Sequence, residues 1–138
     1  MMDKSQILKF ISKQKTAFIG SISAEGYPVV RAMLAPRKIE ENAVYFTTNT
    51  SSKKVAQFKN NAAACVYCYR RGLLKYQGVC LFGTMEICTD QETKDAIWRP
   101  GDQFFYKQGV TDSDYCVLKF TVASTEYYCD MKTETVSF

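Results

Sequence analysis

The stretch YFTTNTSSKK at residues 45–54 contains the residue types best suited to holding a ligand. β-forming residues lead into a run of hydroxyl side chains that ends in Ser51 and Ser52, and Lys53 follows them. Hydroxyl groups, the free amides at the start of a helix and an ammonium group together suit a phosphate dianion. Serines that cap a helix and lysines that face solvent produce the same pattern, so both interpretations stay open on composition alone.

Arg31 is the second candidate, because it lies in the otherwise apolar segment PVVRAML at residues 28–34. Burying a guanidinium group without an anion is costly. A phosphate on a bound ligand would compensate this charge. The alternative is an arginine on an edge strand that faces water or a carboxylate such as Glu25.

The composition excludes several other chemistries. The chain has 138 residues and no histidine, which rules out Ser/His/Asp and Cys/His nucleophiles, histidine-based zinc sites and an imidazole general base. Its net charge of +4 is modest and scattered, so nucleic acid is not expected as a partner. No apolar stretch is long enough to cross a bilayer and the first residues have no apolar signal core, which predicts a cytoplasmic protein that does not enter a membrane.

The six cysteines raise the questions of disulfides and metal binding. Because no secretory segment is present and the chain is long enough to bury a core, reduced thiols are expected. Cys65 and Cys68 form a CxxC motif within a β-forming run, where residues three apart point to opposite faces of a strand. The other cysteines lack ligand-like spacing, so no metal site is predicted.

Periodicity and turn residues predict a mainly β chain with a few helices, and residues 1–138 are expected to form a single domain. Glycines 78 and 83 indicate bulges or close contacts, and residues 39–42 a polar turn. Closure into a barrel would protect the strand edges. The expected helices span residues 3–13, 53–60 and 90–98, and the six expected strands span residues 16–23, 28–36, 43–48, 62–69, 75–88 and 115–122, the last extending toward residues 126–128.

Several segments, in this order, resemble the pyridoxamine 5'-phosphate oxidase-like, FMN-binding split-barrel family, and most closely its general stress protein branch. The similarity covers nearly the whole chain, and the ordered set is more specific than any one piece. The segments are GYPVVRAM at residues 26–33, VYFTT at 44–48 followed by SSK at 51–53, residues 77–83, and AIW at 96–98 followed by DSDY at 112–115.

The resemblance implies a six-stranded antiparallel Greek-key split β-barrel with flanking helices. It also implies a homodimer with two FMN sites at the subunit interface, in which Gln77 reaches the flavin of the neighbouring subunit. The arginine-led strand would lie along the flavin, and the segment 46–48 would lie beside the ring. The cofactor-binding residues implied in this way are Arg31, Ala32, Met33, Leu34, Phe46, Thr47, Thr48, Ser51, Ser52, Lys53, Gln77 and Trp98, with Arg31, Ser51, Ser52 and Lys53 at the phosphate; the alternative for Trp98 is packing.

The resemblance also limits the function. Pyridoxamine phosphate oxidases close their substrate site with a C-terminal arginine and histidine, which this chain lacks, so true pyridoxal phosphate synthesis is not expected. An FMN-dependent oxidoreductase remains, either a flavin reductase or an oxidase of an unknown small-molecule substrate, with an electron donor such as NAD(P)H. The alternatives are a non-catalytic protein that binds flavin or another planar ligand, and a dimeric scaffold that has lost its flavin. Without histidine, haem could not be held by an imidazole.

Overall fold

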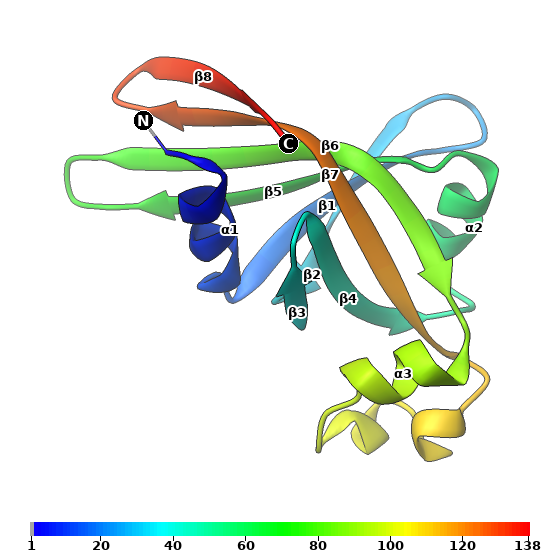
Figure 1. The fold of residues 1–138 in the computed structure, drawn as a ribbon. Coiled ribbons are helices and arrows are strands. Elements are labelled where there is room, and N and C mark those ends of the chain that lie inside the picture. The colour runs from blue at the N-terminus through cyan, green and yellow to red at the C-terminus, as the bar shows by residue number, and fades with distance from the viewer. Residues whose placement is uncertain (1) are drawn as a thin grey trace.

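The computed structural model describes residues 2–138 and contains one antiparallel sheet with helices packed against it (Figure 1). The mainly β fold predicted from the sequence is confirmed, as are helices near all three expected positions. The strands are β1 (Thr16–Ile22), β2 (Pro28–Leu34), β3 (Lys38–Glu40), β4 (Ala43–Asn49), β5 (Ala63–Arg71), β6 (Tyr76–Cys88), β7 (Tyr115–Cys129) and β8 (Lys132–Ser137). The α-helices are α1 (Lys4–Ser12), α2 (Lys53–Asn60) and α3 (Gln91–Ile97), and short 3-10 turns follow at Asp102–Phe104 and Gly109–Thr111.

The eight strands form an open split barrel. Their order is β2-β1-β5-β6-β7-β4-β3, and β8 pairs with β7 beside this path. The sheet is therefore not closed by hydrogen bonds; β2 and β3 are the ends of this path, and β8 is a further edge strand beside β7. Among residues 2–138, no helix is long and apolar enough to span a membrane.

The sheet has two more strands than the six expected. Of the segment predicted as a polar turn at residues 39–42, residues 39–40 belong to β3, whereas the turn is confirmed at Glu41, where φ is +55°, and Asn42. The strand β8 follows a two-residue turn made by Asp130 and Met131, both with positive φ. A two-residue hairpin turn with positive φ is usually recognised in a sequence by glycine or asparagine. Neither residue is present, so the sequence carried little signal for it.

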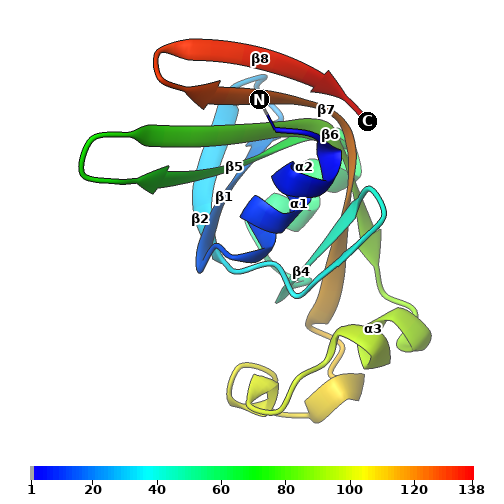
Figure 2. The same cartoon turned by 60° about the vertical axis from the view of Figure 1, so that its left-hand side comes forward.

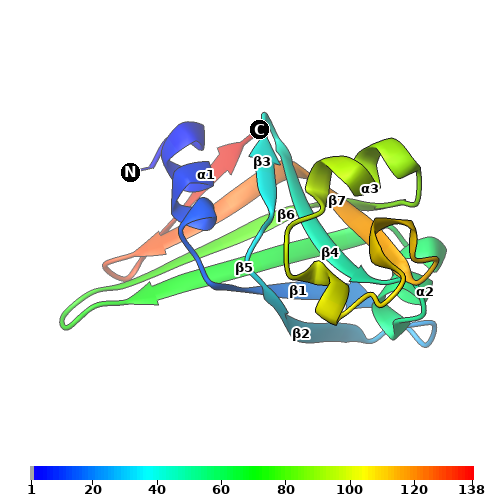
Figure 3. The same ribbon diagram turned by 90° about the horizontal axis from the view of Figure 1, so that it is seen from below.

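The main core lies between the concave side of the sheet, α1 and α2 (Figure 2). Asp3 and Gln6 form a capping box that starts α1, and its apolar stripe places Ile7 and Ile11 fully inside the core. From the sheet, Phe46 and Phe120 fill the same space. Seen from below, α2 lies at one end of β1 and β2, while α1 lies toward the other end of the sheet (Figure 3).

A bulge bends the pair β6–β7. Phe82 pairs with Ser124 whereas Gly83 pairs with Val122, so Ala123 is an extra residue in β7. A Cβ atom at Gly83 would lie only 1.9 Å from the backbone oxygen of Thr121. The sequence prediction that Gly83 marks a bulge or close contact is therefore confirmed.

Candidate functional site

Arg31 points to the inner side of β2, where it meets α2. Along β2 the exposure alternates, with Arg31 half-buried between the exposed residues Val30 and Ala32. Its Nη1 donates to the carbonyl oxygen of Ile19 at 3.1 Å, and its Nη2 donates to Oε1 of Gln57 at 3.0 Å. Burial lowers the pKa of the Arg31 guanidinium. The side chain is thus held in place by neutral acceptors.

Lys54 is a second cation beside Arg31. Its Nζ donates to Oγ1 of Thr48 at 2.8 Å. Burial lowers the pKa of Lys54, and the nearby charge of Arg31 lowers it further. Within residues 2–138 the ion pairs are Arg37–Asp102, Lys38–Glu40 and Lys75–Asp130, so neither Arg31 nor Lys54 has an acidic partner there. Two partly desolvated cations that repel each other favour an anion between them.

Two hydroxyl groups near these cations have no hydrogen-bond partner. Oγ1 of Thr50 and Oγ of Ser52 are buried and unpaired in the described structure. Ser52 is the N-cap residue of α2, yet its side chain makes no capping bond to the helix. The first amides of α2 and these hydroxyls are donors without acceptors. We call the side chains of Arg31, Lys54, Thr50 and Ser52, together with the backbone amides of the first turn of α2, the anion cradle.

Asp114 fixes the loop that leads into α2. Its carboxylate accepts hydrogen bonds from Nδ2 of Asn49 and from the amide of Ser51, both at 2.9 Å, and its carbonyl accepts from the amide of Thr50 at 2.7 Å. The bonds from Asn49, and then those from the amide and hydroxyl of Ser51, lower the pKa of Asp114. Ser51 is therefore already engaged with Asp114.

Of the residues predicted from the sequence, Thr48 contacts Lys54, Arg31 lies near Lys54, and Ser52 is the N-cap of the same helix. Lys53 is exposed and lines a hollow of about 240 Å³ with Ser23, Glu25 and Gln57. Sequence reasoning missed Lys54, Thr50 and Gln57. Helical spacing could have indicated Lys54, because it lies one turn before the buried Phe58.

The side chains of the other residues predicted on β2 and β4 do not all point to the same side of the sheet. Met33 packs on the core, while Ala32 and Leu34 are exposed on the opposite face of β2. Phe46 is buried in the core and Thr47 is half-buried. Only the backbone of Phe46 is therefore available to a ligand.

Gln77 and Trp98 lie elsewhere. Gln77 is on the long β5–β6 hairpin, at the opposite end of the molecule from α2 (Figure 1). Its Nε2 donates to the hydroxyl of Tyr127 at 3.1 Å. Trp98 follows α3 and packs edge-on against Tyr115, with ring centroids 5.1 Å apart. Neither joins the anion cradle within one chain.

Cys65 and Cys68 face opposite sides of β5, as their spacing predicts. Cys68 is in the core, where burial raises the pKa of its thiol to about 12. Cys65 lies on the outer face within hydrogen-bonding reach of Cys80, and its Sγ occupies the space that a Cβ at Gly20 would need. The hydrogen bond from Cys80 lowers the pKa of Cys65 to about 6, while the thiol of Cys80 has a raised pKa.

This thiol pair gives a testable pH dependence. Because the pKa of Cys65 is lowered to about 6, its thiolate should form between pH 5 and 7, well below the range of an ordinary cysteine. The ultraviolet absorbance of the thiolate should rise in this interval. Cys65→Ser should abolish the step and Cys80→Ala, which removes the hydrogen-bond donor, should move it to higher pH, whereas Cys68→Ser should leave it in place. A wild-type protein with no thiolate signal below pH 8 would contradict the assignment.

Comparison with known proteins agrees with the fold. The sequence matches the family profile described as pyridoxamine 5'-phosphate oxidase over residues 4–129. A search of curated protein sequences found no match. A solved structure from Clostridium acetobutylicum, a protein related to general stress protein 26 of Bacillus subtilis in the pyridoxinephosphate oxidase family, is 29% identical. That alignment covers 99% of this chain and 97% of the other, with a TM-score of 0.83.

Two further structures share the fold at low identity. A pyridoxamine 5'-phosphate oxidase-related, FMN-binding protein from Nostoc punctiforme is 13% identical, with 90% of this chain and 87% of that chain covered and a TM-score of 0.68. A heme-binding protein from Mycobacterium smegmatis is 12% identical, with 99% and 60% covered and a TM-score of 0.75. Since the family profile spans nearly the whole chain and the split-barrel fold agrees with it, the chain belongs to the pyridoxamine 5'-phosphate oxidase-like family.

Proposed function

We propose that this protein binds FMN, with the phosphate in the anion cradle, and that it acts as an FMN-dependent oxidoreductase on a small-molecule substrate. The observation that carries the proposal is the pairing of two cations that have no acidic partner within residues 2–138 with two unpaired buried hydroxyls, those of Thr50 and of the N-cap Ser52, just before α2. The FMN-binding protein from Nostoc punctiforme, which shares the fold, supports the choice of ligand.

The donors of the cradle fit a phosphate monoester. Such a group carries between one and two negative charges near neutral pH, which Arg31 and Lys54 together can neutralise. The hydroxyls of Thr50 and Ser52 and the first amides of α2 would each gain an acceptor. In this proposal Lys54 supplies the ammonium group that the sequence assigned to Lys53. Residues 31–34 and 46–48 would border the flavin ring.

Bound FMN would supply hydride or electron transfer, and the chain's own residues would hold and orient it. This division suits a protein without histidine. Gln57 would help to orient the guanidinium of Arg31, because its Oε1 accepts hydrogen bonds from both Arg31 and the hydroxyl of Ser21. The electron donor proposed is a reduced nicotinamide nucleotide. All six cysteines are free, which supports a cytoplasmic location.

The proposed assembly is a homodimer. The outer face of the sheet carries large apolar side chains around a hollow of about 600 Å³, and Val30, one of the residues that line it, is 66% exposed. Monomeric proteins rarely expose so large an apolar surface. The resemblance stated above, which assigns Gln77 to the flavin of the neighbouring subunit, also requires a dimer. The face comprises Phe18, Val30, Leu34, Tyr67, Tyr69, Tyr76, Phe82 and Tyr128.

Introducing a charge on this face should separate the subunits. Val30→Glu alters a side chain that is exposed in the single chain, so it should not impair folding, but it would bury an unpaired carboxylate in a dimer. Light scattering should show the mass of two chains for the wild-type protein and of one chain for Val30→Glu. Val30→Thr is the matched control, because it keeps the shape without a charge, and it should stay dimeric. A wild-type protein of one-chain mass at micromolar concentration would refute the dimer.

A non-catalytic carrier of flavin or another planar ligand is the second candidate, and the heme-binding protein from Mycobacterium smegmatis with the same fold favours it. The two functions are separated by titrating the flavin-free protein with FMN and then adding NADH or NADPH without oxygen. Binding followed by loss of the flavin absorbance supports the oxidoreductase. Binding with no bleaching supports the carrier, and a protein that does not bind FMN would refute both flavin proposals.

A further inference from the structure

Gln57 is the residue of α2 that contacts the guanidinium group of Arg31. Its Oε1 accepts a hydrogen bond from Nη2 of Arg31 at 3.0 Å and another from the hydroxyl of Ser21 at 2.5 Å. An arginine can only donate hydrogen bonds, so the oxygen of the Gln57 amide must face it. Ser21 is buried on β1, and Arg31 lies on β2. Gln57 thus joins the helix to both strands through one oxygen atom.

Both acceptors of Arg31 are uncharged. The second is the carbonyl oxygen of Ile19, which lies 3.1 Å from Nη1. A guanidinium group has five N–H groups, and these two contacts use two of them. Glu25, the carboxylate considered as an alternative partner in the sequence, forms no ion pair with Arg31 within residues 2–138. Arg31 is therefore fixed in position while its charge stays uncompensated and further donors stay free for a ligand.

The amide at position 57 decides how much of this charge a ligand meets. A glutamate there would have the same length and could accept the same two hydrogen bonds, but its carboxylate would form an ion pair with Arg31. Lys54, whose charge interacts with that of Arg31, lies three residues before Gln57 and so on the same face of α2. With the neutral amide, an anion between Arg31 and Lys54 meets both positive charges. With a carboxylate, one of the two would already be compensated.

We propose that Gln57 is a specificity-determining residue, which holds Arg31 in place and leaves its charge available to a phosphate group. The inference rests on the proposed function, because the ligand favoured in this way is FMN and the ligand disfavoured is riboflavin, the same flavin without a phosphate. Riboflavin has no charged group to place in the anion cradle. The charge on Arg31 therefore adds to the affinity for FMN alone, and Gln57 preserves the difference between the two affinities.

The variant Gln57→Glu tests the proposal, because it adds a charge and keeps the shape and both hydrogen bonds. The flavin-free protein is titrated with FMN and with riboflavin, and binding is followed by flavin fluorescence. The affinity for FMN should fall by about tenfold or more, corresponding to about 1.4 kcal/mol, whereas that for riboflavin should change by less than about threefold. Without a ligand, the variant should unfold at the temperature of the wild-type protein or above it, because a charge-assisted hydrogen bond to Arg31 is stronger than a neutral one.

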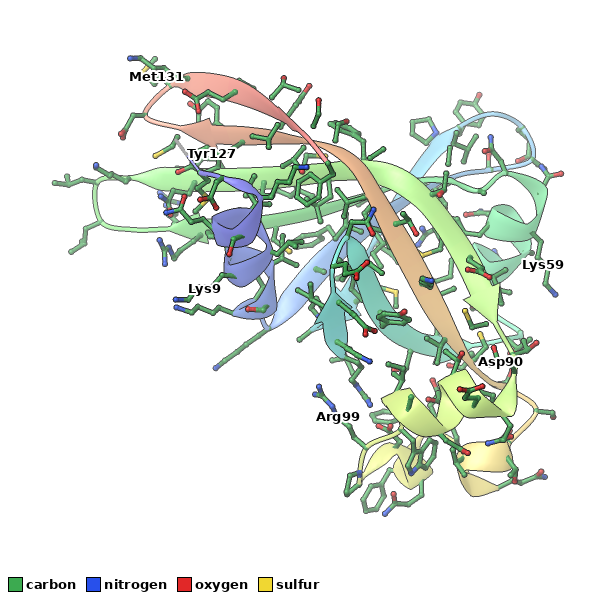
Figure 4. All side chains as sticks on the ribbon, viewed as in Figure 1. Lys9, Lys59, Asp90, Arg99, Tyr127 and Met131 are labelled. Atoms are coloured by element: carbon green, nitrogen blue, oxygen red, sulfur yellow. The ribbon has the colours of Figure 1, made fainter. Side chains whose placement is uncertain are left out.

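Lys59→Gln is the matched control. It lowers the net charge by the same amount and on the same helix, but Lys59 is exposed and its side chain points away from the sheet (Figure 4). The affinity of this variant for FMN should stay within about threefold of the wild-type value. The unfolding temperature separates the charge effect from damage to the fold, because a merely structural role of Gln57 would lower the stability and the affinities for both flavins together.

Equal affinity of Gln57→Glu and the wild-type protein for FMN would overturn the proposal, and so would equal losses for FMN and riboflavin. If the wild-type protein does not bind FMN, the proposed function fails, and inorganic phosphate then tests Gln57 by itself. Phosphate should raise the unfolding temperature of the wild-type protein and of Lys59→Gln, and should raise that of Gln57→Glu much less. An equal rise in all three proteins, or no rise in the wild-type protein, would show that Gln57 does not control the charge that an anion meets.

Discussion

Replacing Lys54 with glutamine should weaken FMN binding by about tenfold or more, because a charge-assisted hydrogen bond contributes roughly 1.5–3 kcal/mol. Arg31→Gln should have an effect of similar size. Together the two substitutions would leave a phosphate in the anion cradle with no cation, and affinity should fall by about a hundredfold if the two losses add. Quenching of FMN fluorescence on titration of the flavin-free protein measures each affinity.

Lys53→Gln provides the matched control, since it removes the same charge from the adjacent residue. The side chain of Lys53 is exposed, so its loss should change FMN affinity by less than about threefold, as expected for a screened surface charge. If FMN affinity fell strongly in Lys53→Gln and not in Lys54→Gln, the phosphate would bind at Lys53, as expected from the sequence, and the assignment to Lys54 would be wrong. Thermal unfolding of each variant shows whether Thr48, which loses its bond to Lys54, still packs normally.

The sequence could select Arg31 as a candidate because its signal is local. A cation in an apolar strand has a desolvation cost that can be recognised without knowing the fold. The choice between Lys53 and Lys54 is different, because it depends on which face of α2 meets β2. One residue along a helix changes direction by about 100°, and only the packing of Phe58 against the core decides it.

Contacts between residues on neighbouring strands also could not be predicted from the sequence. The CxxC spacing correctly separated Cys65 from Cys68, but the thiol that Cys65 does meet, Cys80, is determined by the register of β5 on β6. In that register Cys65 lies opposite Phe82, and Cys80 lies one step away along the diagonal on the same face. The fold was easier to predict, because strand alternation and helix caps recur along the sequence. The strand β8 was missed, because the turn before it contains no glycine.

Substituting Gly83 by alanine should cost about 3 kcal/mol of folding free energy or more, the upper range for overpacking. The added Cβ would lie 1.9 Å from the backbone oxygen of Thr121 and 3.2 Å from the ring of Phe120. Backbone cannot rotate away as a side chain can, so β6 and β7 would have to separate at the bulge. These two strands form the centre of the sheet, with β5 on one side and β4 on the other. Urea denaturation measures the loss.

Thr84→Ala, at the next residue, distinguishes this steric effect from a general sensitivity of β6. Thr84 is exposed and pairs with Thr121 across the same strands, so removing its side chain should cost at most about 0.5–1 kcal/mol. If Gly83→Ala lost no more stability than Thr84→Ala, the bulge at Ala123 would have to absorb the added methyl group by a shift of β7. In that case the bend between β6 and β7 would be adjustable, and the close contact at Gly83 would not fix the curvature of the sheet.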